Sequence, residues 1–180
     1  MHQSLTTEAL VLKRSNVGEA DRIITLLTRE EGKLTTVAKG VRQLKSSKRA
    51  FVEPGNHIKC SLVMGYSLPI MTQATLVADV GSIRDNLSHI RQLMQLLEIV
   101  DSLFVAEQNQ TELFEQVMEM HTRIVSGHAN AAWTREKLEQ LIVDLGYQPF
   151  TETRYQTIGE YVSFLADRPM KTWEFLKLTS

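Results

Sequence analysis

The chain has 180 residues, with 20 Lys and Arg against 21 Asp and Glu, 43% hydrophobic residues and one cysteine, Cys60. These proportions are typical of a globular protein of one or two domains, and they exclude a disordered or fibrous chain. One cysteine supplies neither an intramolecular disulfide nor a thiolate cage for zinc. No apolar run reaches the ~18 residues that span a bilayer, and the first residues lack a signal-peptide pattern, so we expect a cytoplasmic protein without a membrane segment.

The net charge of −1 averages over two unlike halves. Residues 1–79 hold 11 basic and 7 acidic residues, a net charge of +4, whereas residues 80–180 hold 9 basic and 14 acidic residues, a net charge of −5. Phosphate binding depends on clustered Lys and Arg rather than on their total number. The sequence therefore predicts that only the first half contacts a polyanion.

Hydrophobicity alternates with a period of two from residue 8 to residue 77, which is typical of β-strands. The clearest strand is predicted at residues 58–64, and a matching strand at residues 68–76 follows the turn Gly65-Tyr66-Ser67. Three earlier strands are expected at residues 9–14, 22–29 and 33–39, separated by turns around Gly18 and Gly32. Five short strands predict a small barrel or sandwich.

From Ser82 onward the apolar residues recur with helical spacing. Helices are predicted at residues 83–104, 113–124, 138–145 and 158–165, with a terminal segment around Trp173 and Leu176. The expected helix boundaries are capping boxes at Ser82/Asp85 and Thr157/Glu160, stops at Gly127 and Gly146, and a stop before Pro169. The change of period divides the chain into a β domain at residues 1–79 and an α-helical domain at residues 80–180.

The segment from Gly32 to Val52 is the most informative part of the sequence, because no acidic residue lies between Glu31 and Glu53. Basic side chains on a strand and loop are typical of a phosphate-binding track, whose affinity falls steeply with salt. A solvated surface loop is the alternative interpretation. The candidate DNA-binding residues are Lys33, Lys39, Arg42, Lys45, Lys48 and Arg49.

Only two aromatic residues of this half, Phe51 and Tyr66, are candidates for base stacking. Phe51 opens a strand-like stretch and is expected to belong to the core, whereas Tyr66 lies beside a glycine turn and is more open. A platform that stacks several bases is therefore not predicted, and phosphate contacts should dominate the binding.

The sequence contains no catalytic constellation. Cys60 lies in the inward register of the clearest strand, and His57 points to the opposite face, so the two cannot form a nucleophile and base. His121 and His128 are separated by Gly127, which makes a metal pair unlikely to form, and the carboxylates are spread as solvated charge. Phosphate-loop, dinucleotide and nucleophile-elbow motifs are absent. We therefore expect no enzyme activity, no cofactor and no metal.

The first half of the chain resembles the N-terminal domain of the RecO family of bacterial DNA repair and recombination mediators. The resemblance depends on several motifs in the correct order and spacing. These are residues 9–12 (ALVL), 18–28 (GEADRIITLLT), 32–33 (GK), 38–42 (AKGVR), Pro54 and residues 72–74 (TQA). In the second half, Leu145-Gly146-Tyr147 and the segment after Pro169 match the family more loosely.

This resemblance implies an N-terminal five-stranded OB-fold barrel followed by an all-α domain. It also implies that the protein binds single- and double-stranded DNA, anneals complementary strands, and loads the RecA recombinase together with RecR and single-strand-binding protein. By motif position, Lys33, Lys39 and Arg42 are carried over as DNA contacts, whereas Lys45, Lys48 and Arg49 are supported mainly by their charge.

Two departures from the family concern the second half. Many members carry a four-cysteine zinc module after the Leu-Gly-Tyr turn, but only some 20 residues separate Gly146 from Pro169 here, and none is Cys. We therefore expect a zinc-free, internally shortened helical domain. Whether any partner surface built from the missing region is kept, including part of the RecR contact, stays open. For the acidic, Phe-ended tail of single-strand-binding protein, we expect a pocket between the first two helices near Arg84, Arg91 and Arg123.

Two other functions remain open. The barrel could serve only as a docking module, which would make the protein an adaptor. It could also bind RNA, because phosphate contacts do not distinguish the two sugars.

Overall fold

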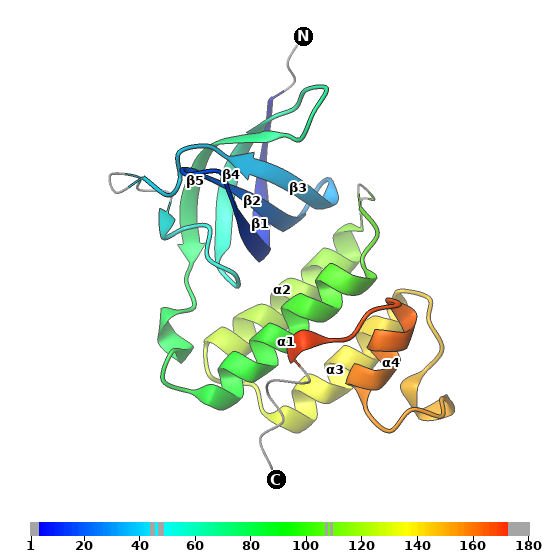
Figure 1. Cartoon of the computed structure of the whole chain (residues 1–180). Helices are drawn as coiled ribbons and strands as arrows, with labels where there is room; N and C mark the ends of the chain where they lie inside the picture. The colour runs from blue at the N-terminus through cyan, green and yellow to red at the C-terminus, as the bar shows by residue number, and fades with distance from the viewer. Residues whose placement is uncertain (1–3, 44–45, 47–48, 107, 109, 173–180) are drawn as a thin grey trace. The chain divides into compact units, whose positions relative to one another are not determined.

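The computed structural model describes residues 4–43, 46, 49–106, 108 and 110–172 (Figure 1). The chain forms two compact units. The first contains the described residues up to Val80 together with Val105–Phe114, and the second contains Gly81–Phe104 and the described residues from Glu115 onward. The predicted order of a β unit followed by helices is confirmed.

The first unit is a closed sheet of five strands. The strands are β1 (Ser4–Val17), β2 (Asp21–Thr28), β3 (Gly32–Ala38), β4 (His57–Val63) and β5 (Ile70–Ala78). They pair in the order β1-β2-β3-β5-β4, and β4 pairs back to β1, so that the sheet closes into a barrel. All pairs are antiparallel except β3 with β5, which run parallel. β1 is long enough to pair with β4 through its first half and with β2 through its second.

The barrel core consists of inward-facing residues from all five strands, as the alternation predicts. Ile24, Leu26, Ile58 and Leu62 are fully buried, and Cys60 is 1% exposed. Along β3 the inward residues alternate with partly exposed ones such as Lys33. The interpretation of Cys60 as a small buried residue is therefore confirmed.

The strand boundaries differ from the prediction mainly in β1. This strand continues to Val17, so Asn16 and Val17 pair with β2 and do not form the turn. The turn follows at Gly18, whose φ of 56° is the left-handed conformation that glycine adopts without a steric penalty.

Residues 105–114 belong to the first unit, although they follow α1 in the sequence. The predicted single boundary at residue 79 therefore does not describe the division of the chain completely. Ala106 forms a parallel bridge with Lys33, and the hydroxyl of Thr111 donates a hydrogen bond of 3.5 Å to the carbonyl of Arg29. This segment therefore lies along the start of β3, at one end of the barrel.

The second unit is helical. Its elements are the 3₁₀ turn η2 (Gly81–Ile83), α1 (Leu87–Leu103), α2 (Thr111–Val125, which begins in the first unit), α3 (Ala131–Asp144), the 3₁₀ turn η3 (Phe150–Glu152) and α4 (Ile158–Leu165). Helix α1 packs against α3 and α4. Leu93, Leu96, Ile99 and Val100 of α1 are each at most 1% exposed, so this helix is the centre of the helical core. Among the described residues, no helix combines the length and apolar character needed to cross a bilayer.

Helix boundaries follow four of the five predicted signals, including the end of α4 at Leu165, before Pro169. Thr157 caps α4 by accepting a hydrogen bond from the Glu160 amide, and Gly127 and Gly146 follow α2 and α3 with positive φ angles. The predicted capping box at Ser82 and Asp85 is wrong. Asn86 caps α1 instead, so this helix begins at Leu87 rather than at residue 83, and Leu87 is 67% exposed. The predicted terminal segment around Trp173 and Leu176 lies outside the described residues.

Candidate nucleic-acid interface

The loop that follows β3 carries most of the predicted basic residues, and its start is tied to the turn between β1 and β2. The Asp21 carboxylate accepts a hydrogen bond of 2.8 Å from the Gly40 amide. The Arg42 amide donates to the carbonyl of Ala20 at 2.9 Å, and its guanidinium Nη1 donates to the carbonyl of Gly18 at 2.8 Å. These bonds explain why an acidic residue and glycines precede the basic segment in the sequence.

Two buried valines anchor the same loop in the barrel core. Val41 and Val52 are both fully buried within the core cluster. Between them the chain carries Arg42 and Arg49. These two anchors fix the loop in the barrel core at residues 41 and 52.

Asn56 fixes the end of the loop. Its side-chain amide donates to the carbonyls of Ala50 at 2.9 Å and Phe51 at 3.2 Å, and its oxygen accepts from the Val80 amide at 3.3 Å. Asn56 is only 3% exposed, so these hydrogen bonds replace water contacts that the buried amide has lost.

The acid that ends the basic segment, Glu53, is neutralised locally. Its carboxylate accepts from Nη2 of Arg14 at 2.8 Å and from Nη1 of Arg22 at 3.2 Å. Arg22 is 6% exposed and therefore serves the structure of the barrel, whereas the side chain of Arg14 is about one-third exposed. Sequence reasoning missed Arg14 as a cation beside the loop, because the two residues are 39 apart in the chain.

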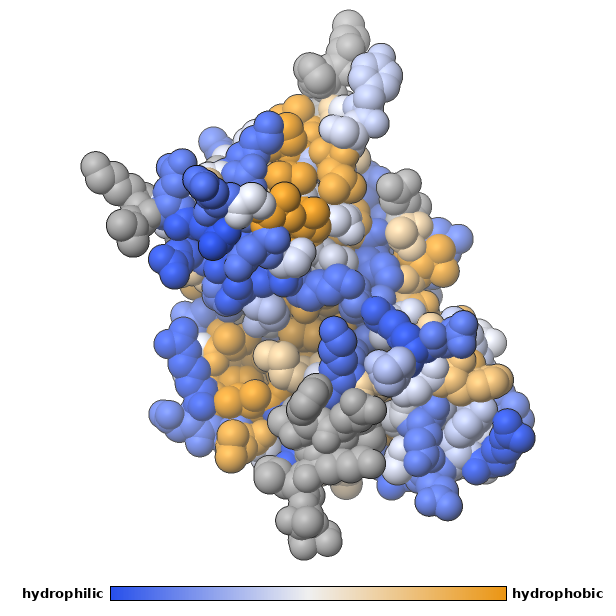
Figure 2. All heavy atoms as spheres, viewed as in Figure 1, coloured by the Kyte–Doolittle hydropathy of each residue, from blue (hydrophilic) through white to orange (hydrophobic). Residues whose placement is uncertain are grey.

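The predicted DNA-binding residues fall into three groups. Lys39 and Arg49 are exposed, and Lys33 and Arg42 are half-buried. Lys45 and Lys48 lie outside the described residues. Figure 2 shows hydrophilic side chains gathered over one flank of the barrel, beside an apolar patch. Lys33 lies at the start of β3, and Lys39 directly follows the end of the same strand, so the two predicted cations are spread along the length of β3.

The two aromatic candidates have different environments. Phe51 is half-buried and packs against the barrel core, as expected. Tyr66, in the hairpin between β4 and β5, is fully exposed.

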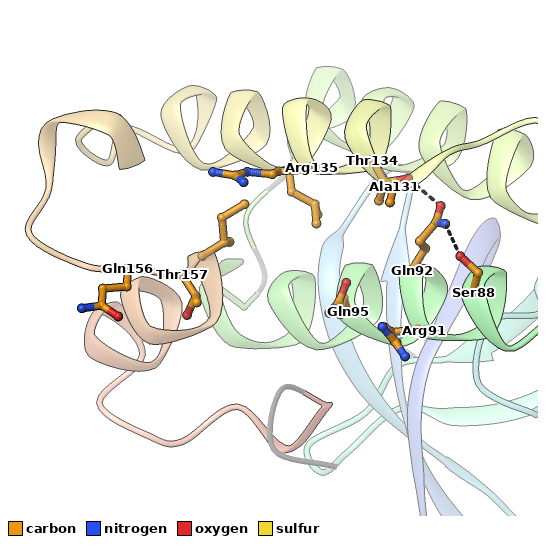
Figure 3. A pocket seen from close by; sticks show the side chains of 11 residues that line it. Ser88, Arg91, Gln92, Gln95, Ala131, Thr134, Arg135, Gln156 and Thr157 are labelled. Carbon is orange, nitrogen blue, oxygen red and sulfur yellow. Dashed lines mark hydrogen bonds between the residues drawn. The ribbon is translucent and has the colours of Figure 1, made fainter. Parts of the chain in front are cut away.

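In the helical unit, the predicted arginine pocket is wrong in its composition. Arg123 stacks on the ring of Trp133 at 4.4 Å and donates from Nε to the carbonyl of His128 at 3.3 Å. Arg84 is exposed and does not line the cavity that contains Arg91. That cavity lies between α1 and α3, with the start of α4 at its side, and not between α1 and α2 (Figure 3).

The cavity has a volume of about 310 Å³ and combines two cations with apolar and amide groups. Arg91 of α1 and Arg135 of α3 line it together with Leu138 and Ile158. Nε of Arg91 is buried and has no hydrogen-bond partner within the described residues. A buried guanidinium N–H without a partner is costly, and an anionic group in the cavity would satisfy it.

Polar side chains fix the wall of this cavity. Gln92 accepts a hydrogen bond of 2.7 Å from the hydroxyl of Thr134 and donates to that of Ser88 at 3.1 Å, which joins α1 to α3. Arg135 donates to the carboxylate of Glu139 at 3.0 Å, so part of its charge is already compensated.

Groups for metal or nucleophilic chemistry do not gather in the described part of the chain. No cluster of three His, Cys, Asp or Glu side chains in it could hold a metal ion. Burial, and to a smaller extent the charge of Glu30, raises the pKa of the Cys60 thiol to about 12. A thiol with so high a pKa stays protonated at neutral pH and is a poor nucleophile.

Comparison with known proteins places this architecture in a family. Residues 1–80, which form the β unit, match the family described as Recombination protein O N terminal.

Curated relatives extend the similarity into the helical unit. The chain is 41% identical to the DNA repair protein RecO of Heliobacterium modesticaldum over 96 residues, which are 53% of this chain and 35% of the relative. It is 26% identical to that of Syntrophomonas wolfei over 148 residues, 82% of this chain and 59% of the relative. It is 35% identical to that of Bifidobacterium longum over 138 residues, 76% of this chain and 55% of the relative. The matches thus span between about a third and three-fifths of each relative. These similarities show that the chain belongs to the RecO family.

Proposed function

We propose that this chain is a DNA repair and recombination mediator that binds single- and double-stranded DNA through its β unit. The observation that supports this most is the anchored basic loop, on which Lys39 and Arg49 are exposed and no acid interrupts the sequence from Glu31 to Glu53. Phosphate contacts need such accessible, clustered cations, and they need no catalytic residue.

We infer that the β unit is an OB-fold. Five strands that close into a barrel, with β1 shared between β2 and β4, have the strand number and Greek-key character of that fold. OB-folds bind oligonucleotides through the face of strands β2 and β3 and through the β1–β2 and β4–β5 loops. We assign the loop after β3 to the same surface, because its start is hydrogen-bonded to the turn between β1 and β2.

The proposed partners follow from the family. With DNA bound, the chain would anneal complementary strands and act with RecR and single-strand-binding protein to help load the RecA recombinase. The cavity of Arg91 and Arg135 is the proposed site for the acidic, Phe-ended tail of single-strand-binding protein, because two guanidinium groups can pair with carboxylates while Leu138 and Ile158 contact an aromatic ring.

Fluorescence anisotropy with labelled oligonucleotides tests the DNA-binding proposal. The double variant Lys39→Gln, Arg49→Gln removes two exposed cations without disturbing the bonds of Arg42 to the barrel. If each contacts one phosphate, the slope of log K against log salt should fall by about 1.4 for a single strand and about 1.8 for a duplex. The variant Lys59→Gln is the matched control, because Lys59 is exposed on β4 outside the loop.

Absence of binding at low salt would overturn the proposal, and so would equal slopes for the double variant and the unchanged protein. Capture of RecR or single-strand-binding protein without any DNA affinity would support the adaptor instead. Competition between DNA and RNA of the same length and sequence separates the proposal from an RNA-binding function, since stronger retention of RNA would favour the latter.

A further inference from the structure

The barrel contains a groove between β3 and the hairpin that joins β4 to β5. The groove has a volume of about 760 Å³. One wall is formed by β3 residues Leu34 and Thr35, and the other by the hairpin residues Met64, Tyr66 and Leu68. Both walls belong to the same compact unit.

The groove exists because β3 and β5 pair over a very short length. Their only registered pair is Val37 with Ile70, where the Val37 amide donates to the carbonyl of Pro69 at 2.8 Å. Before Val37 the hairpin diverges from β3, and at the far end the bridge between Lys33 and Ala106 limits the opening. The barrel wall is therefore open between β3 and the hairpin, over about the length of one short strand.

Tyr66 and Leu68 present apolar surface at this opening. Tyr66 is fully exposed and Leu68 is 43% exposed, so neither contributes much to the stability of the core. No ring of the described residues pairs with Tyr66, which leaves both faces of its phenol ring accessible. A fully accessible aromatic ring at a groove is suited to stacking on a planar partner.

The charges around the groove select the kind of partner. Lys33 and Lys39 lie at the two ends of β3 in the same register, about 20 Å apart at the usual rise per residue. Lys33 lies between the lining residues Glu31 and Leu34 in the sequence, whereas Lys39 lies beyond the pair of Val37 with Ile70 that closes the groove. Phosphates are thus attracted to the ends of β3 and repelled from the groove wall. An uncharged planar group on an anionic backbone, which is a nucleobase, fits this pattern.

We propose that Tyr66 stacks on an unpaired base of single-stranded DNA whose backbone follows the outer face of β3. This inference rests on the proposed DNA-binding function and adds a residue that discriminates between strands. The bases of a duplex are already stacked and paired, so Tyr66 contributes only where a base is free. The charged loop then supplies affinity for any DNA, and Tyr66 supplies preference for single strands.

Anisotropy titrations with a single-stranded oligonucleotide and the matching duplex test the inference. Because stacking on one aromatic ring is worth about 1–3 kcal/mol, Tyr66→Ala should weaken single-strand binding by about 5-fold to 100-fold. Duplex binding should stay within about twofold, since no stacked base is lost, and Tyr66→Phe should retain the single-strand affinity because the ring is kept. Phe164→Ala is the control, because this residue is an exposed aromatic of α4 in the other unit.

Photo-crosslinking to an oligonucleotide that contains 5-iododeoxyuridine gives a second measurement, with a crosslink expected at Tyr66. Single-strand affinity that is unchanged in Tyr66→Ala, an equal loss for duplex and single strand, or crosslinks that avoid residues 64–69 would each overturn the stacking role. In all three cases the salt-dependent loss in Lys39→Gln, Arg49→Gln would still support DNA binding. Failure of the unchanged protein to bind either DNA would instead overturn both proposals.

Discussion

Cys60 lies in the barrel core, where burial opposes ionisation of its thiol. Its pKa is raised from 9.0 to about 12, chiefly by burial and secondarily by the charge of Glu30. The thiol of the unfolded chain ionises at the lower pKa, whereas the folded barrel keeps it protonated. The resulting stability is therefore fully present below pH 9 and is lost as the pH rises from 9 to 12.

We expect the free energy of unfolding to fall more steeply with pH in the unchanged protein than in Cys60→Ala. Between pH 7 and pH 10 the difference should be about 1.4 kcal/mol, because pH 10 lies one unit above the pKa of the unfolded thiol and each unit corresponds to about 1.4 kcal/mol. Urea unfolding at both pH values measures it, and the comparison cancels the titration of Lys and Tyr. The same pH dependence in both proteins would show that ionisation of this thiol is not coupled to folding.

Single residues also show where prediction from sequence ends. The alternation around Cys60 was sufficient to predict its burial, because a strand side chain has only two faces to choose from. The partner of Arg91 could not be predicted in the same way. Arg123 and Arg135 both lie on helices that follow α1, and only the packing of α3 against α1 decides that Arg135 shares its cavity.

Among the elements, the loop after β3 depends on Asn56 for its position. In Asn56→Ala the carbonyls of Ala50 and Phe51 and the amide of Val80 lose their partner, so we expect a stability loss of about 1–3 kcal/mol and more frequent opening of the loop. Trypsin cleaves after Lys and Arg, and residues 42–49 contain four of them. Cleavage within this segment should therefore accelerate.

Limited proteolysis with mass spectrometry measures this effect. Asn56→Asp should behave like Asn56→Ala, because it removes the side-chain donor to Ala50 and Phe51. Asn130→Ala is the matched control, since Asn130 caps α3 in the other unit and its loss should destabilise the protein without exposing the loop. Equal loop cleavage in Asn56→Ala and in Asn130→Ala would contradict a specific anchoring role.

The elements themselves were predictable in number and order, because each has a local pattern of its own. Alternating burial identified β4, and apolar periodicity identified the helices. The end of β1 and the start of α1 could not be predicted from the sequence, since both depend on tertiary partners. Pairing with β2 extends β1 to Val17, and the hydroxyl of Ser82 donates to the carbonyl of Val125 rather than capping the helix. Physical competition between local and tertiary hydrogen bonds decides such boundaries.

At the scale of the whole molecule, the two halves carry opposite net charges, and this difference affects which ligand each half can bind. The basic loop and the groove at Tyr66 belong to one compact unit, and the cavity of Arg91 and Arg135 belongs to the other. In the proposed function, the first set binds DNA and the second binds carboxylates in a peptide of single-strand-binding protein. The net charge of −5 on residues 80–180 disfavours a long polyanion such as DNA. In the proposal, a short acidic peptide with an apolar end still gains from two guanidinium groups and an apolar wall.

Binding of the acidic peptide should therefore be separable from DNA binding. For a labelled, short acidic peptide that ends in Phe, Arg135→Ala should weaken binding by about tenfold, as expected for the loss of one charge-assisted hydrogen bond. Arg91→Ala should have a similar effect, whereas Arg154→Ala, which removes an exposed arginine outside the cavity, should have none. Peptide anisotropy at fixed salt measures these changes.

The same peptide should bind Lys39→Gln, Arg49→Gln with unchanged affinity, and Arg135→Ala should keep its affinity for DNA. Combining the changes should give additive free energies within about 0.5 kcal/mol, because the groups belong to separate units and share no partners. Unchanged peptide binding in Arg135→Ala would remove the cavity as the peptide site. A loss of peptide binding in Lys39→Gln, Arg49→Gln would instead mean that acidic peptide and DNA compete for the basic loop, and the barrel alone would then account for both ligands.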